Sequence, residues 1–295
     1  MCRLFLGFIA LLFALSSAIA QTNSNVVKLG VLDFGATPIA KLSTDKIRSG
    51  LRTESNIQLI DPDLSATAAR GVGYSGSLNM STSEARDLGS AMDAEFYVIG
   101  DAQTLRRNSS TNPVYYESYS SVFVISARTG RLIFWDRLKA ESDKTTAAEE
   151  QLDSTLKAKQ TAERCLEAIR KAQLEESNQR AIEVGSPPPL IADAPDDEKI
   201  ADVQGVRLPR PYRRLRPTYP ETAAVADAEA TVDVLVDVGA DGEVSNVQIT
   251  RWGGFGLDET TIATVRQLHF FPAQRNGTPI PMRVLLRYNF RKPSK

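Results

Sequence analysis

The run from Tyr219 to Phe290 constrains the fold more than any other part of the chain, because its strands and turns can be placed from the residue pattern. From Val232 to Val238, valines alternate with aspartate or leucine, which is the two-residue period of a half-buried strand. Asp241-Gly242 tolerates positive φ and predicts a reversal of the chain. A second strand follows, and its irregularly spaced apolar residues predict a β-bulge: Val244, Val247 and Ile249.

The rest of this run predicts one helix and a closing strand. After Gly253-Gly254, residues recur at helical spacing, with two carboxylates in the first turn where they favour the helix dipole, and we expect the helix to end near His269. The Asn276-Gly277 turn then leads to a strand with two different faces. One face is apolar and is expected to pack on the helix: Val284, Leu286, Tyr288 and Phe290. The other is basic and is expected to meet water: Arg283, Arg287 and Arg291.

The first half predicts a mixed sheet with helices packed on it. Five segments read as strands: Val26–Phe34, Ile57–Ile60, Glu95–Leu105, Val114–Ala127 and Leu132–Leu138. Three read as helices: Ser43–Arg52, Asp63–Ala69 and a helix to about Met92 that opens on the capping pattern Ser81-x-x-Glu84. Thr145 to about Glu183 predicts one long helix. We expect this helix to close the domain, and a coiled-coil homodimer is the alternative, disfavoured because Lys159 interrupts the apolar stripe.

These patterns predict an α+β protein of two domains, residues 25–183 and 207–295, joined by a linker at 184–206. The linker contains Pro187-Pro188-Pro189 and an acidic stretch, and prolines stiffen a chain toward an extended form. The two halves differ in charge: residues 21–204 carry 21 basic and 27 acidic side chains, whereas residues 205–295 carry 13 and 9. This asymmetry is too small to indicate a nucleic-acid-binding protein.

Residues 1–20 predict a secretory signal peptide. Arg3 precedes the apolar stretch Leu4–Leu15, and Ala18-Ile19-Ala20 is a small-residue cleavage pattern, so the mature chain is expected to begin at Gln21. An uncleaved anchor is the alternative, because Leu4–Ala20 is close to the lower limit of about 17 residues for a spanning helix. This segment predicts a secreted protein, held at the membrane if the segment stays uncleaved.

The sequence offers no catalytic constellation, cofactor motif or metal site, and we expect a protein that is not an enzyme. Gly71–Gly76 fits G-x-G-x-x-G but follows a predicted helix, whereas dinucleotide binding requires a preceding strand. His269 is the only histidine and is expected to be a packing or helix-dipole residue. Cys165 lies in mid-helix and is expected to be buried and inert.

A set of short motifs between Tyr219 and Phe290 resembles the C-terminal domain of the TonB energy transducers of Gram-negative bacteria. The motifs follow the family's order: Tyr219-Pro220, the valine strand, Asp241-Gly242, Gly256-Leu257-Asp258, Phe271-Pro272-Ala273, Gly277-Thr278-Pro279 and Phe290. The resemblance covers about residues 207–291. It implies a small domain of antiparallel strands packed on one helix, with Tyr219, Pro220, Asp241, Gly242, Leu257, Asp258, Phe271, Pro272, Gly277 and Phe290 defining the fold.

The same resemblance implies a function in binding. Family members pair their last edge strand with a short segment of an outer-membrane transporter, because an edge strand has unpaired backbone groups that an extended peptide satisfies. The corresponding residues here are Arg283, Leu285, Arg287 and Asn289. Inner-membrane motor proteins are a further implied partner. However, residues 4–20 contain no histidine, which the family uses where its membrane helix meets those proteins, so binding is better supported than force transmission.

Two further expectations concern the rest of the chain. Five arginines precede the TonB-like motifs, and they are either a solvated segment paired with the acidic stretch upstream or a contact to an anionic surface: Arg207, Arg210, Arg213, Arg214 and Arg216. Around Val31-Leu32-Asp33-Phe34, Ala94–Gly100 and Thr129-Gly130-Arg131-Leu132, residues 25–140 resemble the periplasmic domain of curli-secretion and flagellar-assembly lipoproteins and of the TolB N-terminus. The alternative function is therefore a structural or envelope-assembly factor with a generic peptide-binding module.

Overall fold

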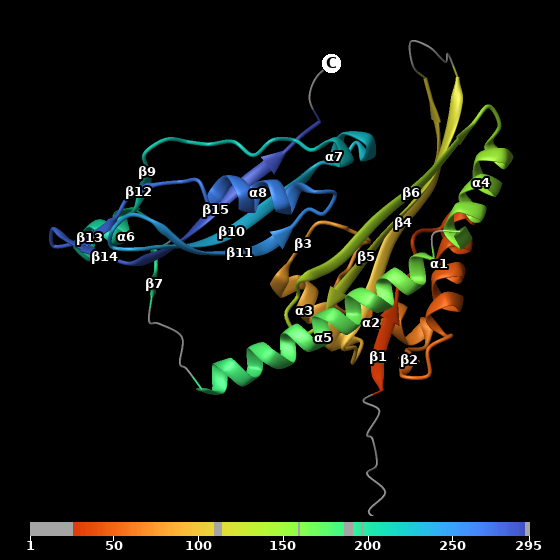
Figure 1. Cartoon of the computed structure of the whole chain (residues 1–295), viewed down its shortest axis with the longest axis horizontal. Helices are drawn as coiled ribbons and strands as arrows, with labels where there is room; N and C mark the ends of the chain where they lie inside the picture. Colours follow the sequence, from red (N-terminus) through yellow and green to blue (C-terminus); the bar gives the residue numbers. More distant parts are fainter. Residues whose placement is uncertain (1–25, 109–113, 159, 186–190, 196–197, 293–295) are drawn as a thin grey trace, which may run out of the picture.

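The computed structural model describes residues 26–108, 114–158, 160–185, 191–195 and 198–292, so the predicted signal peptide lies outside the described residues. Within these ranges the chain forms two α+β domains that lie against each other (Figure 1). This confirms the predicted fold class.

The first domain is built on a five-stranded mixed sheet. Its strands lie in the order β2 (Ile57–Leu59), β1 (Val27–Val31), β4 (Phe96–Arg107), β5 (Tyr115–Ser126) and β6 (Leu132–Ser142). The pairs β1–β2 and β1–β4 are parallel, whereas β4, β5 and β6 form an antiparallel meander. Alternating elements followed by a meander are what the sequence predicted.

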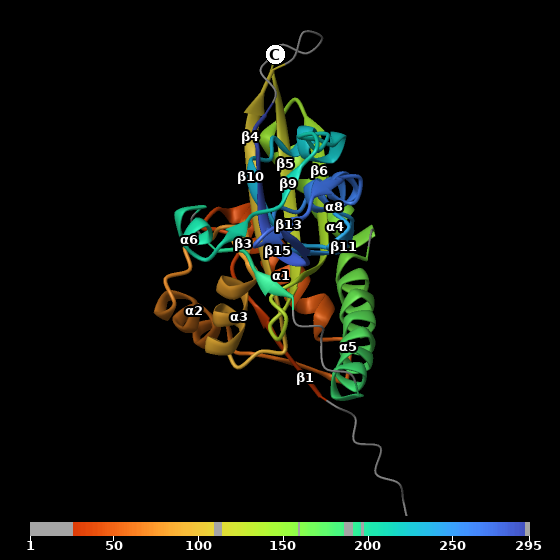
Figure 2. The same cartoon turned by 90° about the vertical axis from the view of Figure 1, so that its left-hand side faces the viewer.

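Helices cover both faces of this sheet. On one face lies α1 (Pro38–Leu51), which begins earlier than predicted because the Thr37 hydroxyl accepts from the N–H of Ala40 and Pro38 fits the first turn. On the opposite face lie α2 (Pro62–Gly71) and α3 (Thr82–Ala91), seen beside the sheet in Figure 2. The predicted capping box at the start of α3 is confirmed: the Ser81 side chain accepts from the backbone of Glu84, and the Glu84 carboxylate accepts from the backbone of Ser81.

The long helix predicted from Thr145 to Glu183 is wrong, because two helices form instead. α4 (Thr145–Ala158) and α5 (Thr161–Gly185) meet at an angle, and Gln160 between them has a φ of 48°. Leu152 and Leu156 pack with Ile39 and Leu138, whereas the α5 side chains Cys165, Leu166 and Ile169 pack in a separate core over the sheet. A straight helix cannot pack a single apolar stripe against two separate cores, so the helix is interrupted between them. Both helices close the first domain, as expected.

The C-terminal domain has an antiparallel sheet with one helix on it. β10 (Ala230–Val238) lies between β11 (Val244–Trp252) and β15 (Met282–Phe290), and a register shift after Asp237 confirms the predicted bulge. α8 (Leu257–Val265) covers the apolar face, and the short α7 (Glu221–Ala226) lies near the end of β15 (Figure 1). α8 ends at Val265, before the predicted His269.

Much of the predicted linker folds against the C-terminal domain. β7 (Ala192–Asp193) pairs with β15, α6 (Glu198–Val203) follows, and β8 (Val206–Arg207) pairs with β13 (Ala273–Arg275), which also pairs with β14 (Thr278–Ile280). β9 (Arg210–Pro211) pairs with β12 (Phe270–Phe271). Ala201 and Val206 are buried beside Ala273 and Met282. These residues therefore act as part of the domain and not as an extended spacer.

The two domains share one hydrophobic core. β3 (Met80–Ser81), from the first domain, pairs antiparallel with the end of β11 and so joins the C-terminal sheet. The Trp252 side chain is 1% exposed, its Nε1 donates to the Gly130 carbonyl at 3.1 Å, and its ring lies 6.0 Å from that of Phe123. Phe255 also packs on Phe123 at 5.3 Å. The sequence pattern did not predict this contact.

Candidate partner-binding edge

β15 is an open edge of the C-terminal sheet over most of its length. It pairs with β10 along all nine of its residues, from Ala230↔Phe290 to Val238↔Met282. On its other side, β7 pairs only with Met282 and Arg283. From Val284 to Phe290, no described strand occupies the outer side of β15. This region is the predicted partner-binding strand.

The outward backbone groups of β15 can be assigned from one hydrogen bond. The Arg283 carbonyl accepts from the Ala194 N–H at 2.7 Å, so the backbone of Arg283 points away from β10. Successive residues of a strand point their backbone groups to opposite sides. The N–H and C=O groups of Leu285, Arg287 and Asn289 therefore face the open edge. These are the residues that the sequence predicted, together with Arg283.

The side chains of the same residues form a polar outer face. Arg283 holds Asp237 through two hydrogen bonds of 2.5 and 3.0 Å, and Arg287 holds Asp233 through two of 2.7 and 2.8 Å. Pairs that share no backbone hydrogen bonds bring their side chains closest across antiparallel strands, which fits this register. The Arg283 guanidinium beside Asp237 lowers the pKa of that carboxyl. Leu285 is 54% exposed between the two arginines.

Arg287 and Arg291 of the basic face are exposed, as expected, and arginines of this face also bind buried carboxylates. Asp233 and Asp237 are 6% and 4% exposed, because the arginine side chains lie over them. Reversing the charge of Arg287 would place a second carboxylate beside buried Asp233, so Arg287→Glu is expected to weaken the fold as well as any binding. Leu285 and the outward backbone groups remain the accessible features of the edge.

The residues that define the domain occupy structural positions, with one exception. The Tyr219 hydroxyl donates to the Ala228 carbonyl at 2.8 Å, Pro220 precedes α7, and Leu257 and Phe290 are buried. Gly242 and Gly277 have φ values of 85° and 83°, which favour glycine. Phe271 is the exception: it is 58% exposed and its ring lies 4.3 Å from the exposed ring of Tyr212, so it is a surface residue.

Residues 216–291 match the sequence profile of the family described as Gram-negative bacterial TonB protein C-terminal. The C-terminal domain is TonB-like. Protein TonB of Klebsiella aerogenes is 33% identical over 81 residues, which are 28% of this chain and 33% of that protein. The chain thus spans about a third of the length of this relative.

Two solved structures are also similar. The solution structure of the TonB C-terminal domain of Pseudomonas aeruginosa has 20% identity and a TM-score of 0.26, covering 30% of this chain and 89% of that chain. The C-terminal domain of LpoB from Salmonella enterica has 17% identity and a TM-score of 0.28, covering 42% and 88%. The resemblance of residues 25–140 to curli-secretion, flagellar-assembly and TolB domains stays a prediction.

Asp258 of the TonB-like domain is a partly buried carboxylate in the first turn of α8. Its two oxygens accept from the N–H groups of Gly253 and Gly254 at 2.8 and 2.9 Å. Burial raises the pKa of the Asp258 carboxyl from 3.8 to about 6, against the opposing effect of these two hydrogen bonds.

This pKa predicts how Asp258→Asn changes stability with pH. Between about pH 4 and pH 6 the folded chain keeps a proton that the unfolded chain has lost, so the wild-type free energy of unfolding falls as pH rises. Asparagine does not titrate. The free energy of unfolding of the variant should therefore rise by roughly 3 kcal/mol relative to that of the wild type as pH increases across this range. Urea unfolding of both proteins from pH 4 to pH 8 measures the difference. Parallel profiles would contradict the raised pKa.

The arginine cluster before the TonB-like motifs lies on the surface. Arg207, Arg210, Arg213, Arg214 and Arg216 are all exposed. Among the described residues, none of the five forms an ion pair with the acidic stretch upstream or with another carboxylate. The exposed rings of Tyr212 and Phe271 lie beside them. Contact with an anionic surface stays a prediction.

The remaining sequence candidates do not form a chemical site. Gly71–Gly76 follows α2 and precedes β3, so no strand enters it. Cys165 is buried, and burial raises the pKa of its thiol to about 12. His269 is exposed and pairs with Glu243 at 2.9 Å, so the expected packing role is wrong. No group of three or more potential metal-ligating side chains occurs in the described part of the chain.

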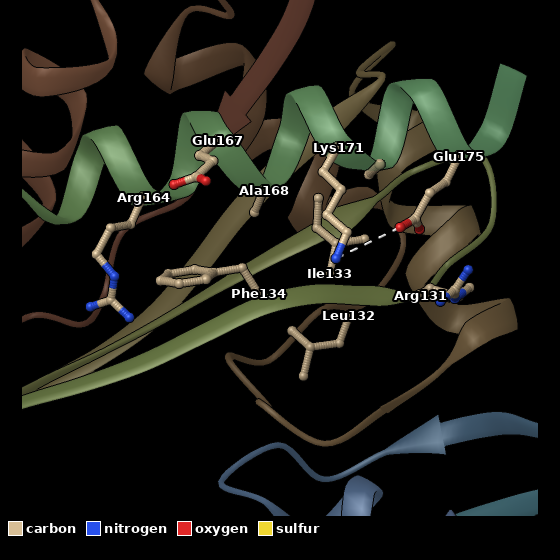
Figure 3. Close-up of a pocket in the computed structure, with 10 residues that line it drawn as sticks. Arg131, Leu132, Ile133, Phe134, Arg164, Glu167, Ala168, Lys171 and Glu175 are labelled. Carbon is tan, nitrogen blue, oxygen red and sulfur yellow. Dashed lines mark ion pairs between the residues drawn. The ribbon is translucent and has the colours of Figure 1, made fainter.

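A groove in the first domain is lined by apolar and charged side chains that form no recognisable catalytic or metal-binding arrangement. It has a volume of about 450 Å³ and lies between α5 and β6 (Figure 3). Lys171 pairs with Glu175 along the helix, and the Arg164 guanidinium lies 5.1 Å from the centre of the Phe134 ring and pairs with Asp136. Lys171, Glu175 and Arg164 of this groove therefore each have an ion-pair partner of opposite charge. Over the residues described, no helix is both long and apolar enough to cross a bilayer.

The sequence missed the residues that attach the TonB-like domain to the first domain. The Asn79 side chain donates to the carbonyls of Thr231 and Trp252 at 2.8 and 2.6 Å and accepts from the Thr231 N–H at 3.1 Å. At the other end of the contact, Arg107 donates to the Asp227 carboxylate at 2.8 Å. Asp227 has a positive φ of 50°, and no periodic pattern marks either pair.

Proposed function

We propose that the protein is a periplasmic adaptor whose TonB-like domain binds an extended segment of an outer-membrane transporter by strand addition to β15, and that it acts by binding and not by catalysis. The open edge from Val284 to Phe290 carries this proposal. A partner strand there would satisfy the outward backbone groups of Leu285, Arg287 and Asn289. Transmission of force from inner-membrane motor proteins is a further part of the proposal that the same edge would serve.

The side chains of the edge favour selective pairing. Exposed arginines on an edge strand discourage aggregation between identical edges, and Arg283 and Arg287 are fixed by buried aspartates. The exposed side chain of Leu285 lies between them and offers an apolar contact to a side chain on the same face of an added strand. Backbone hydrogen bonds would supply affinity, and this short apolar position would supply specificity.

A second candidate function is an envelope-assembly or structural factor. The observation that favours it is the shared core: the rings of Phe123 and Phe255 pack across the domain boundary, and β3 extends the TonB-like sheet. A domain fixed in this way reaches less far than one on an extended spacer. In this role the first domain would select the partner, and β15 would serve as a generic peptide-binding edge.

Photo-crosslinking in living cells separates the two functions. A photoreactive amino acid at Leu285 is expected to capture a partner held at the β15 edge. The matched control is the same amino acid at Leu174, which is 64% exposed on α5, away from the edge. Capture of the N-terminal segment of an outer-membrane transporter at Leu285 alone supports the adaptor. Capture of other envelope proteins there supports the assembly factor, and equal products from both positions exclude β15 as the binding edge.

A further inference from the structure

A second groove lies between the two domains, on the opposite side of the TonB-like sheet from β15. It has a volume of about 700 Å³. One wall belongs to the first domain and includes Arg86 of α3 and the turn between β5 and β6, and the other wall is the strand β11. Both views place β11 next to the first domain (Figures 1 and 2). The groove is therefore separate from the candidate partner-binding edge.

The β11 wall is itself an open strand edge. β3 pairs only with Arg251 and Trp252, so Val244–Thr250 has no described strand on that side. Because Val234 and Val236 direct their backbone groups to β15, Leu235 and Asp237 direct theirs to β11. Their partners Gln248 and Asn246 face β10, and the intervening Val247 and Ile249 direct their N–H and C=O groups into the groove.

The opposite wall is basic. Arg86, Arg128 and Arg131 line the groove, and no carboxylate is among the residues that line it. Arg128 pairs with Glu176 at 2.7 Å, whereas Arg86 and Arg131 are exposed and form no ion pair within the described residues. Apolar surface is also present, because Ile182 of α5 is 67% exposed at the groove. An unpaired strand edge thus faces two guanidinium groups that have no ion-pair partner among the described residues.

We propose that this groove binds an extended acidic peptide segment, which adds to β11 as a strand. Open backbone groups at Val247 and Ile249 would pair with its main chain, and Arg86 and Arg131 would pair with its carboxylates. About 23 Å of β11 is open at 3.3 Å per residue, which suits a segment of six or seven residues. The TonB-like sheet would then carry a binding edge on each side, one of them completed by the first domain.

Fluorescence anisotropy with the purified protein tests this proposal. The probe is a labelled peptide, Glu-Val-Glu-Val-Glu-Val-Glu, and the comparison peptide has lysine in place of each glutamate. We expect the acidic peptide to bind and the basic one to bind at least about tenfold more weakly. Two versions of the acidic peptide with N-methyl groups at alternate residues keep its charge, and the version that blocks the edge-facing amides should lose binding.

Protein variants locate the site. Arg86→Glu with Arg131→Glu should weaken binding of the acidic peptide at least about tenfold, and both residues are exposed and without ion pairs, so the fold should persist. The matched control is Arg213→Glu with Arg214→Glu, two exposed arginines outside the groove, with unchanged binding expected. Thermal unfolding checks that all variants are folded. Amide hydrogen exchange should slow at Val247 and Ile249 when the acidic peptide is bound.

Several results would overturn the proposal. These are equal binding of acidic and basic peptides, unchanged binding of both N-methylated versions, no greater loss in the groove variant than in its control, or protection of Leu285 and Arg287 in place of Val247 and Ile249. The last result would assign the peptide to β15 and leave the proposed function standing. Conversely, failure of crosslinking at Leu285 would contradict the proposed function but would leave the proposal of peptide binding at β11 standing.

Discussion

Replacing Trp252 with alanine is expected to lower the free energy of unfolding by about 3–5 kcal/mol. The side chain is 1% exposed and packs across the domain boundary on Phe123. Its removal leaves a cavity and also leaves the Gly130 carbonyl without the indole N–H that it accepts at 3.1 Å. Trp252 belongs to the TonB-like domain, and Phe123 and Gly130 belong to the first domain. The loss of stability should therefore affect both domains.

Urea unfolding followed by far-ultraviolet circular dichroism measures this effect without relying on tryptophan fluorescence. Tyr212→Ala is the matched control, because Tyr212 is 58% exposed and its replacement should change stability by less than about 1 kcal/mol. Small-angle X-ray scattering adds an independent readout, in which the Trp252 variant should be more extended than the wild type. Equal stability of the two variants would show that the domains do not share a core in solution.

Leu286→Asp is expected to unfold the TonB-like domain. Leu286 lies on the apolar face of β15 opposite Val234, which is fully buried, so an aspartate there would have no cationic partner in the core. Burying such a group costs roughly 3 kcal/mol or more, which is a large share of the stability of a small domain. Loss of dispersed amide signals from the domain in a ¹H–¹⁵N NMR spectrum would report the unfolding.

The adjacent residue provides the control for this variant. Leu285 is 54% exposed on the opposite face, between Arg283 and Arg287, so Leu285→Asp should keep the fold. The same change at two neighbouring positions then differs only in the face of the strand. If both variants unfold, or if Leu286→Asp stays folded, the assignment of faces in β15 is wrong, and with it the assignment of the outward backbone groups.

Local pattern predicted the TonB-like sheet well, because each of its strands has one apolar face. The alternation from Val232 to Val238 predicts a half-buried strand regardless of its surroundings, and Asp241-Gly242 predicts the turn that follows. The capping box at Ser81 and Glu84 is equally local. The fold-defining residues came from the resemblance to the TonB family and not from local pattern. Among them Phe271 is exposed, and its position next to a strand end gives no local sign of that exposure.

The break at Gln160 could not be predicted from the helix itself. Thr145 to Glu183 keeps helical spacing apart from the interruption of its apolar stripe at Lys159. The two helices that form pack on different cores, with Leu156 in one and Cys165 in the other. In the same way, the proline and acidic composition of residues 184–206 indicates an extended linker, yet Ala201 and Val206 are buried against the TonB-like domain. Both outcomes depend on surfaces supplied by distant parts of the chain.

Periods and turns within single segments were enough to predict two α+β domains and a strand with an apolar and a basic face, and the resemblance to family motifs implied the TonB-like character of the last third. Only the tertiary structure decided that β15 is open beyond Arg283, that Asp233 and Asp237 hold its arginines, and that β3 and Trp252 fix the domain to its neighbour. Those features join residues far apart in the chain, and no local pattern records such contacts.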